Sequence, residues 1–384
     1  MRCLSSALAA NLCLALLAAQ AATAQKYKVT DLGTLGGQSF GMDIGQTGKV
    51  TGDSYIACSE CALSHAFLYR NGIMLDLGTL PGGSFSSGFG ISEGERREGE
   101  RRKELLVTGS SNFESCTFDN CSPIHAVLFK NGNVIDLGTL PGGTDSQGYA
   151  VNREGDVTGW ADDGQNQHPF LYTDGEMRDL GTLPGGVEGF GMDLTEGESR
   201  DRDTRWANHR DREQRVQVTG FSSTAAGFEH AFLYRNGKMH DLGTLPGGSS
   251  SAGYAINQDG QVTGYSSASD GNAHAILYTH GVMHDLGTLP GRTESFGDDI
   301  NRFGRIVGFS RLGFDSHAFL YSHGAMQDLN DLISPTSGWI LEFANALNDR
   351  GQITGTGNHN GEEHAFRLTP ISDPKIDEDG DDSD

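Results

Sequence analysis

The chain has 384 residues, and 55 of them are glycine, about twice the usual share. The glycines do not recur every third residue, so the chain is not a collagen. With hydrophobic residues at only 36%, this composition disfavours a helix bundle and favours many short strands joined by tight turns, where glycine is at its best. The net charge of −23 disfavours a nucleic-acid binder and electrostatic docking on anionic membranes, and leaves cations and neutral ligands such as sugars open.

Residues 1–24 have the pattern of a secretory signal peptide. Arg2 supplies a basic start, a leucine- and alanine-rich stretch follows, and Ala22-Thr23-Ala24 fits the small-x-small cleavage rule. The mature chain is predicted to begin at Gln25 and to be secreted, either extracellular or periplasmic. A membrane anchor is the alternative for this segment, and no later stretch has the roughly 18 apolar residues that span a bilayer.

Four cysteines remain after signal removal, in two close pairs: Cys58 with Cys61 and Cys116 with Cys121. In an exported protein they predict disulfides, and the two local bridges are the simplest of three possible connectivities. Four thiolates at this spacing could instead bind zinc.

Internal repetition dominates the rest of the chain. Seven segments begin with Asp-Leu, and most continue as DLGTLPGG: Asp31, Asp76, Asp136, Asp179, Asp241, Asp285 and Asp328. A second landmark, HAFLY or a relative, begins at His65, His125, His168, His230, His274, His317 and His364. A third, VTG or a relative, also occurs seven times, so the unit is about 43 residues long.

Two charged insertions, about 93–104 and 196–215, lengthen two of the repeats. Segments this polar cannot enter a core, so we expect exposed loops.

Residues 251–291 show the unit most cleanly. Four short strands are expected, near 253–257, 261–265, 274–278 and 282–287, with turns at Asp259-Gly260 and His280-Gly281. In other units Asn-Gly or Asp-Gly takes the place of His280-Gly281, which is the strongest short-range hairpin signal. Counting back from the turn places His230 opposite Gly243, close to Asp241.

Four strands repeated seven times predict an all-β, seven-bladed β-propeller over residues 25–370, followed by an acidic disordered tail, 371–384. Residues 27–33 match only the fourth strand of a unit, and residues 341–368 match only the first three. The N-terminal strand is therefore expected to pair with the C-terminal blade and close the ring.

The motifs HAFLY, NGxMxDLGTLPGG and INxxGxVTG resemble the HAF-family extracellular repeat of bacterial exported proteins, over nearly all of residues 27–368. The resemblance implies a secreted or surface-associated repeat protein without an established activity, and it carries no catalytic residues to transfer. The charged insertions and the last unit, with Arg367 in place of an aliphatic residue, depart from the pattern.

In a propeller, the loops between second and third strands share one face with the connections between blades, and the hairpin turns lie on the other. We call the face with these loops and connections the loop face, and we expect ligands there or in the central channel. The seven histidines could bind metal or titrate near neutrality. Because the histidines recur in every unit, we favour a structural role in which each histidine bonds the aspartate of its own blade. Seven histidines placed one per blade would also lie too far apart to share one ion.

Non-repeated side chains are the better site candidates. Asp43, Asp193, Asp298 and Asp299 fall near first strands, which line the channel, and could hold a cation such as calcium. Tyr55, Phe113 and Phe118 fall in variable loops and could stack on sugars or pack on a blade edge. In the tail, Asp377, Asp379 and Asp381 resemble half of a calcium loop, beside the simpler role of solubilising charge.

No nucleophile elbow, HExxH helix, phosphate loop or dinucleotide motif is present. We therefore expect a monomeric, non-catalytic propeller that needs no cofactor, with calcium as the one candidate ion, and that binds carbohydrate or a cell-surface protein. The alternatives are a polysaccharide-degrading propeller with channel carboxylates as acid and base, and a structural surface protein stabilised by calcium.

Overall fold

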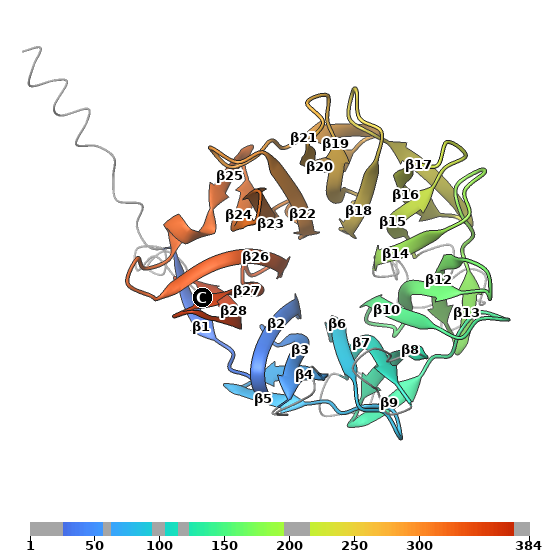
Figure 1. Ribbon diagram of the computed structural model, residues 1–384, viewed down its shortest axis with the longest axis horizontal. Helices are drawn as coiled ribbons and strands as arrows, with labels where there is room; N and C mark the ends of the chain where they lie inside the picture. The colour runs from blue at the N-terminus through green and yellow to red at the C-terminus, as the bar shows by residue number, and fades with distance from the viewer. Residues whose placement is uncertain (1–25, 57–62, 94–103, 114–122, 196–215, 372–384) are drawn as a thin grey trace, which may run out of the picture.

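The computed structural model describes residues 26–56, 63–93, 104–113, 123–195 and 216–371. These residues form seven four-stranded antiparallel sheets, which stand as blades around a central axis in Figure 1. The chain is thus an all-β, seven-bladed β-propeller, as the repeat predicts. The signal segment, the four cysteines, Phe118, residues 94–103, the second insertion and residues 372–384 lie outside the described residues.

Each blade begins at the channel, so its first strand is innermost (Figure 1). Blade 1 has β2 (Gly36–Ile44), β3 (Val50–Ile56), β4 (Ser64–Arg70) and β5 (Ile73–Asp76). Blade 2 has β6 (Ser86–Glu93), β7 (Leu105–Asn112), β8 (Ile124–Lys130) and β9 (Asn133–Asp136). Blade 3 has β10 (Ser146–Val151), β11 (Val157–Asp162), β12 (Gln167–Thr173) and β13 (Glu176–Asp179).

The next three blades repeat this order. Blade 4 has β14 (Gly189–Leu194), β15 (Val218–Ser223), β16 (Glu229–Arg235) and β17 (Lys238–Gly243). Blade 5 has β18 (Ser251–Ile256), β19 (Val262–Ser267), β20 (Ala273–Thr279) and β21 (Val282–Asp285). Blade 6 has β22 (Glu294–Ile300), β23 (Ile306–Leu312), β24 (Asp315–Ser322) and β25 (Ala325–Asp328).

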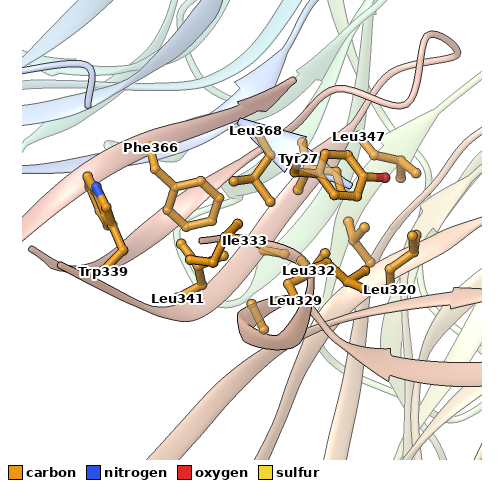
Figure 2. Close-up of a cluster of buried hydrophobic side chains, with 14 residues drawn as sticks. Tyr27, Leu320, Leu329, Leu332, Ile333, Trp339, Leu341, Leu347, Phe366 and Leu368 are labelled. Atoms are coloured by element: carbon orange, nitrogen blue, oxygen red, sulfur yellow. The ribbon is translucent and has the colours of Figure 1, made fainter. Parts of the chain in front are cut away.

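The seventh blade is built from both ends of the described chain. Its first three strands are β26 (Trp339–Leu347), β27 (Ile353–His359) and β28 (Glu362–Pro370). The fourth is β1 (Tyr27–Asp31), which pairs antiparallel with β28. A 3-10 helix, η1 (Leu329–Leu332), precedes the blade, and Figure 2 shows Tyr27 and Leu368 in one buried cluster with its leucines. The predicted closure by the N-terminal strand is confirmed.

The tight turns have the backbone that the sequence predicts. In blades 1 to 6 the first turn residue between third and fourth strands has a positive φ of 52–54°, and a glycine follows it. These residues are Asn71, Asn131, Asp174, Asn236, His280 and His323. Two successive left-handed residues match the twist of a two-residue hairpin, and asparagine and glycine tolerate them best.

The repeated motifs fill the space within and between sheets. The phenylalanine of HAF is fully buried wherever it occurs: Phe67, Phe170, Phe232, Phe319 and Phe366. The glycine of VTG allows the first two strands to approach each other, because a Cβ at Gly264 would lie 2.0 Å from the carbonyl oxygen of Ala252.

A repeated serine connects neighbouring blades. The amide of Ala231 in blade 4 donates to the Ser251 hydroxyl of blade 5 at 2.9 Å, and that hydroxyl donates to the carbonyl of Gly243. Between blades 3 and 4 both halves of this contact change together. Pro169 in the alanine position has no N–H to donate, and Gly189 occupies the serine position.

The asparagine of INxxG connects blades on the opposite face. The Oδ1 atom of Asn301 accepts the amides of Phe303 and Arg305, both at 3.1 Å, which shapes the hairpin. Its Nδ2 atom donates to the carbonyl of Asn348 in blade 7 at 3.3 Å. Asn348 in turn donates to the carbonyl of Gly45 in blade 1 at 3.0 Å, so the contact continues across the closure.

One expected register was wrong by a residue. Ala231, not His230, lies opposite Gly243, because the pairing of β16 with β17 shifts between Ala231 and Phe232. The His230 side chain still reaches Asp241, at 3.0 Å.

Candidate functional site

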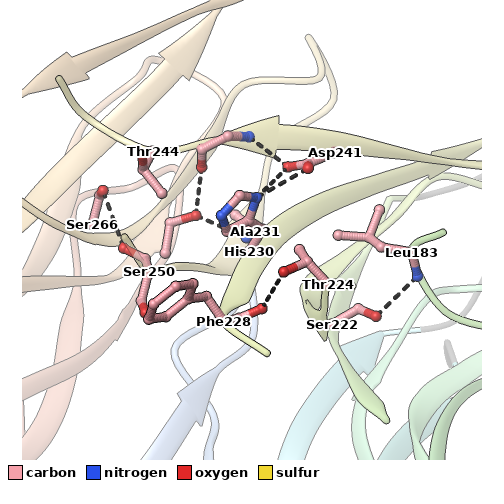
Figure 3. Close-up of polar contacts among 12 residues, drawn as sticks. Leu183, Ser222, Thr224, Phe228, His230, Ala231, Asp241, Thr244, Ser250 and Ser266 are labelled. Atoms are coloured by element: carbon pink, nitrogen blue, oxygen red, sulfur yellow. Dashed lines mark hydrogen bonds and ion pairs between the residues drawn. The ribbon is translucent and has the colours of Figure 1, made fainter. Parts of the chain in front are cut away.

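All seven predicted histidines bond an aspartate of the same blade through Nδ1, at 2.5–3.1 Å. The aspartate also accepts a backbone amide two residues further on, as Asp241 does from Gly243 at 2.7 Å. Figure 3 shows His230 beside Asp241. The pair fixes the strand at the start of each GTLPGG crossing. In the described part of the chain, six of the seven pairs belong to no group of three or more His, Cys, Asp or Glu side chains whose ligand atoms all lie within 4.8 Å of one another.

Three aspartates of the inner strands connect blades across the channel wall. Asp43 accepts the amide of Ile44 at 2.6 Å and the amide of Ile91, on the next blade, at 2.7 Å. Asp193 and Asp299 repeat this pair of contacts, reaching Ile256 and Leu347 on the following blades. Both oxygens of each carboxylate are therefore already hydrogen-bonded.

The blade that donates each amide has a small residue at the position where the preceding blade has its accepting aspartate: Gly90, Ala255 and Ala346. Three such pairs use blades 1–2, 4–5 and 6–7. Because the number of blades is odd, one blade is left without a partner for this aspartate contact. That blade is blade 3, which has Ala150 at the aspartate position.

Burial changes the acidity of these groups. It raises the pKa of Asp43 to about 6, and the hydrogen bonds from Ile91 and Ile44 only partly offset it. Burial also holds the pKa of Asp299 well above its usual range, with further increases from the negative charges of Asp43 and Asp193. The three carboxyls therefore interact electrostatically.

The aspartates border a polar cavity of about 480 Å³ at the hairpin-face mouth of the channel. Hairpin residues complete it, including Gln46, Arg153 and Gln258. Arg302 and Asp349 form an ion pair at its edge, with Nε to Oδ2 at 3.5 Å. The repeat pattern favours ligands on the loop face or in the channel, and no sequence motif predicts this cavity on the hairpin side.

Aromatic rings collect at the loop-face end of the channel, from inner and second strands of blades 4 to 7. We call this set the aromatic arc: Phe190, Phe221, Tyr254, Tyr265, Phe296, Phe309 and Phe343. Every ring keeps partial exposure to solvent.

Ring contacts join blades 5, 6 and 7 along the arc, and a separate stacked pair lies in blade 4. Phe296 stacks on Phe309 of the same blade at 4.8 Å between centroids, Tyr265 of blade 5 lies 5.2 Å from Phe296, and Phe343 of blade 7 lies 5.0 Å from Phe309. In blade 4, Phe190 stacks on Phe221 at 4.9 Å. Such pairs fix ring orientation, so the exposed faces are held in place.

A second cavity lies beside the blade 4 end of the arc. Trp160 of blade 3 lies 5.9 Å from Phe190, and it lines a cavity of about 460 Å³ between blades 3 and 4 on the loop face. Polar side chains form the rest of the wall, among them Asp145, Asn166 and Glu188.

Burial raises the pKa of two carboxyls on the inner and second strands, Asp298 and Asp53. Burial holds the pKa of Asp298 well above its usual range, and it raises that of Asp53 to about 6. Asp298 is the bulged residue of β22. The pKa of the nearby Tyr254 phenol is raised mainly by burial, then by Tyr265 and then by the charge of Asp298. Its neighbour Asp299 is used in the blade contact, so the two adjacent acids differ in role.

The predicted aromatic candidates lie outside the arc. Tyr55 packs edge-on against Phe40 with centroids 6.0 Å apart, near the blade 1 side of the channel. Phe113 packs in the hydrophobic cluster of blade 2 and lies 4.7 Å from the His125 ring. Phe118 and the cysteines fall outside the described residues.

The arc was missed by the sequence argument because its members are spread over about 150 residues. A signal existed. The second strands of blades 4 to 6 have aromatic residues where blade 2 has Ser110, and the first strands of blades 4 and 6 have phenylalanine where blade 2 has Ser87.

Comparison with known proteins identifies no family for this chain. No family model matches the chain, and no curated protein matches its sequence. Among solved structures it is similar to a gluconolactonase of Xanthomonas campestris, at 11% identity and a TM-score of 0.42 over 92% of this chain and 93% of that one. It is also similar to the β-propeller domain of the trilobed protease of Pyrococcus furiosus, at 9% identity and a TM-score of 0.42 over 93% and 99%.

A third similar structure is Trypanosoma rangeli sialidase, at 10% identity and a TM-score of 0.41 over 86% of this chain and 55% of that one. At these identities the likeness concerns architecture and transfers no activity. Within the described residues, no helix is both long enough and apolar enough to cross a bilayer.

Proposed function

We propose that this protein is an exported, non-catalytic β-propeller that binds a carbohydrate at the loop-face mouth of its channel. The observation that carries the proposal is the aromatic arc, a row of partly exposed rings that contact one another across blades 5 to 7, with a stacked pair in blade 4. Sugar rings present flat C–H faces that pack on aromatic faces, while their hydroxyls need polar partners at the rim.

Polar partners for hydroxyl groups lie beside the arc. Asp298 has no hydrogen-bond partner within the described residues, and the cavity next to Trp160 is lined by carboxylates and amides. Gln147 accepts from Trp160 Nε1 at 3.1 Å and from the Tyr149 hydroxyl at 3.0 Å, which extends the polar network toward blade 3.

Charge narrows the class of sugar. The chain has a net charge of −23, and acidic groups surround the proposed site. Such a field repels uronic acids and sulfated or sialylated chains and admits neutral or amino sugars. We therefore propose a neutral or cationic glycan.

The place of action is part of the proposal. The signal-like residues 1–24 and the resemblance to the HAF-family extracellular repeat both support export to the cell surface or the periplasm. A cell-surface glycan would be the natural ligand there.

A glycan panel on the mature chain, with calcium and with chelator, tests the proposal. We expect saturable binding to one neutral or amino-sugar class, independent of calcium, and loss of that binding in Phe309→Ala. Binding confined to sulfated or sialylated glycans, or a blank panel in both conditions, would contradict it and point to a protein ligand.

A polysaccharide-degrading role is the second candidate, and the raised pKa of Asp298, which suits a proton donor, favours it. A glycosidase needs one protonated and one ionised carboxyl near the scissile bond. Incubation of the bound polysaccharide with the protein separates the two functions. Release of reducing ends that stops in Asp298→Asn would establish the enzyme, and binding without release supports the non-catalytic propeller.

A further inference from the structure

The seventh blade differs from the others at its His–Asp pair. As in each blade, the repeat histidine, His364, bonds the aspartate, Asp31, with Nδ1 to Oδ2 at 2.9 Å. A second histidine, His359 of β27, joins them, with Nδ1 to the same Oδ2 at 3.0 Å. Within the described residues, this is the one group of three or more His, Cys, Asp or Glu side chains whose ligand atoms all lie within 4.8 Å of one another.

We propose that Asp31, His359 and His364 bind a divalent first-row transition ion, with Zn²⁺ as the chemical type. Two imidazole nitrogens and one carboxylate oxygen, with water in the open position, form a common zinc ligand set. Tetrahedral ligands about 2.0–2.1 Å from the ion lie roughly 3.3 Å apart. The nitrogen–oxygen distances need to open by only a few tenths of an ångström.

The aspartate does not need the second histidine for the fold. Six blades hold their strand with one imidazole per aspartate. The positions that correspond to His359 hold other residues: Ile56, Phe113, Asp163, Thr224, Ala268 and Leu312. A histidine at this place is therefore particular to the seventh blade, where its Nδ1 points at an oxygen that already has a partner.

The surroundings orient the ligands. Trp339 stacks on the His359 ring, with centroids 4.5 Å apart and planes within 5°. The Glu362 carboxylate lies 3.7 Å from Nε2 of His364. Its negative charge favours a cation bound beside it.

Solvent reaches the three groups. Their side chains are 32% (Asp31), 25% (His359) and 19% (His364) exposed, so an ion can enter without unfolding and keep a water ligand.

The ligands come from β1, β27 and β28, the strands that close the ring. A bound ion would cross-link the N-terminal strand to the C-terminal blade. An ion that binds only the closed protein stabilises closure by mass action. This inference does not depend on carbohydrate binding, because none of its residues belongs to the aromatic arc.

The test is calorimetric titration of Zn²⁺ into the metal-free mature protein with its cysteines replaced by serine, since thiolates could compete. We expect one ion per chain and a higher melting temperature with Zn²⁺. His359→Phe, which places in blade 7 the residue that blade 2 has as Phe113, should weaken binding by more than about tenfold. His230→Asn, which removes an ordinary His–Asp pair, is the matched control and should retain it.

A second ligand variant, His364→Gln, makes the test independent of a folding defect in His359→Phe. Circular dichroism of both variants without metal shows whether each is folded. Loss of binding in both folded variants, with retention in His230→Asn, supports the site. Absence of stoichiometric binding to the parent protein, or equal binding in His359→Phe, would overturn it.

Discussion

Blades 1 to 6 and blade 7 use the same four-stranded unit, but they hold it together differently. In the first six blades the fourth strand follows the third through a two-residue turn. In the seventh, the fourth strand is β1, more than 300 residues away in the chain, and only non-covalent contacts hold it. The comparison shows what a repeat must add where chain connectivity is missing.

What blade 7 adds is buried apolar surface and extra polar contacts. Leu329, Leu332 and Ile333 replace the GTLPGG crossing and are buried with Trp339. The Lys26 amide donates to the carbonyl of Leu332 at 3.0 Å. These contacts offset the entropy lost on joining distant parts of the chain.

The largest effect is expected from removing a core ring at the closure. Phe366→Ala should lower the free energy of unfolding by about 3–5 kcal/mol, because Phe366 is fully buried and its loss leaves a cavity. Phe232→Ala, the equivalent change in blade 4, should cost a similar amount. Urea unfolding gives both values.

Hydrogen exchange separates these two variants. In Phe366→Ala the amides of β1 should exchange faster, because that strand has no covalent turn to hold it. In Phe232→Ala they should stay protected. Equal protection of β1 in both variants would show that closure is no weaker than the other blades.

The acids of the channel provide a second comparison, through pH. Because the pKa of Asp43 is raised to about 6, its contribution to stability is present below the unfolded value and is lost as pH rises through about 6. The urea midpoint should therefore increase from pH 7 to pH 5. Asp43→Asn should reduce this increase, and Asp259→Asn, at an exposed hairpin, should not. An unchanged pH profile in Asp43→Asn would contradict the account.

The smallest effect is expected at Arg367, which stands where the other six blades have leucine. Its guanidinium donates to the carbonyl of Gly48 at 2.7 Å and lies 5.5 Å from the Tyr69 ring, but its buried Nε has no partner. Replacing a buried charge by a well-packed apolar residue is often neutral or stabilising.

Arg367→Leu should therefore change the free energy of unfolding by no more than about 1 kcal/mol, toward higher stability. Arg367→Ala should be less stable than the parent, since it removes packing as well. A large loss in Arg367→Leu would mean that the Gly48 contact is needed for closure.

Much of this fold could be predicted because each repeat carries its own turn chemistry. The His280-Gly281 turn was identified without an asparagine, and the split unit at residues 27–33 and 341–368 predicted closure. Local patterns of this kind fix strand number and order.

The site could be predicted only in part. Asp43 and Asp299 were placed at the channel correctly, but their hydrogen bonds to the next blade depend on a bulge and on small residues opposite. The aromatic arc and the pairing of His359 with Asp31 join positions far apart in sequence, and no local pattern reports such contacts.

The most direct measurement is calorimetric titration of the bound glycan into two phenylalanine variants. Phe309 lies in the arc, and Phe303, 58% exposed, lies on the hairpin face. The account predicts that Phe309→Ala weakens binding at least about tenfold, as expected for loss of a central aromatic contact, and that Phe303→Ala binds as the parent does. Equal affinity in Phe309→Ala, or a loss confined to Phe303→Ala, would contradict a ligand site on the loop face.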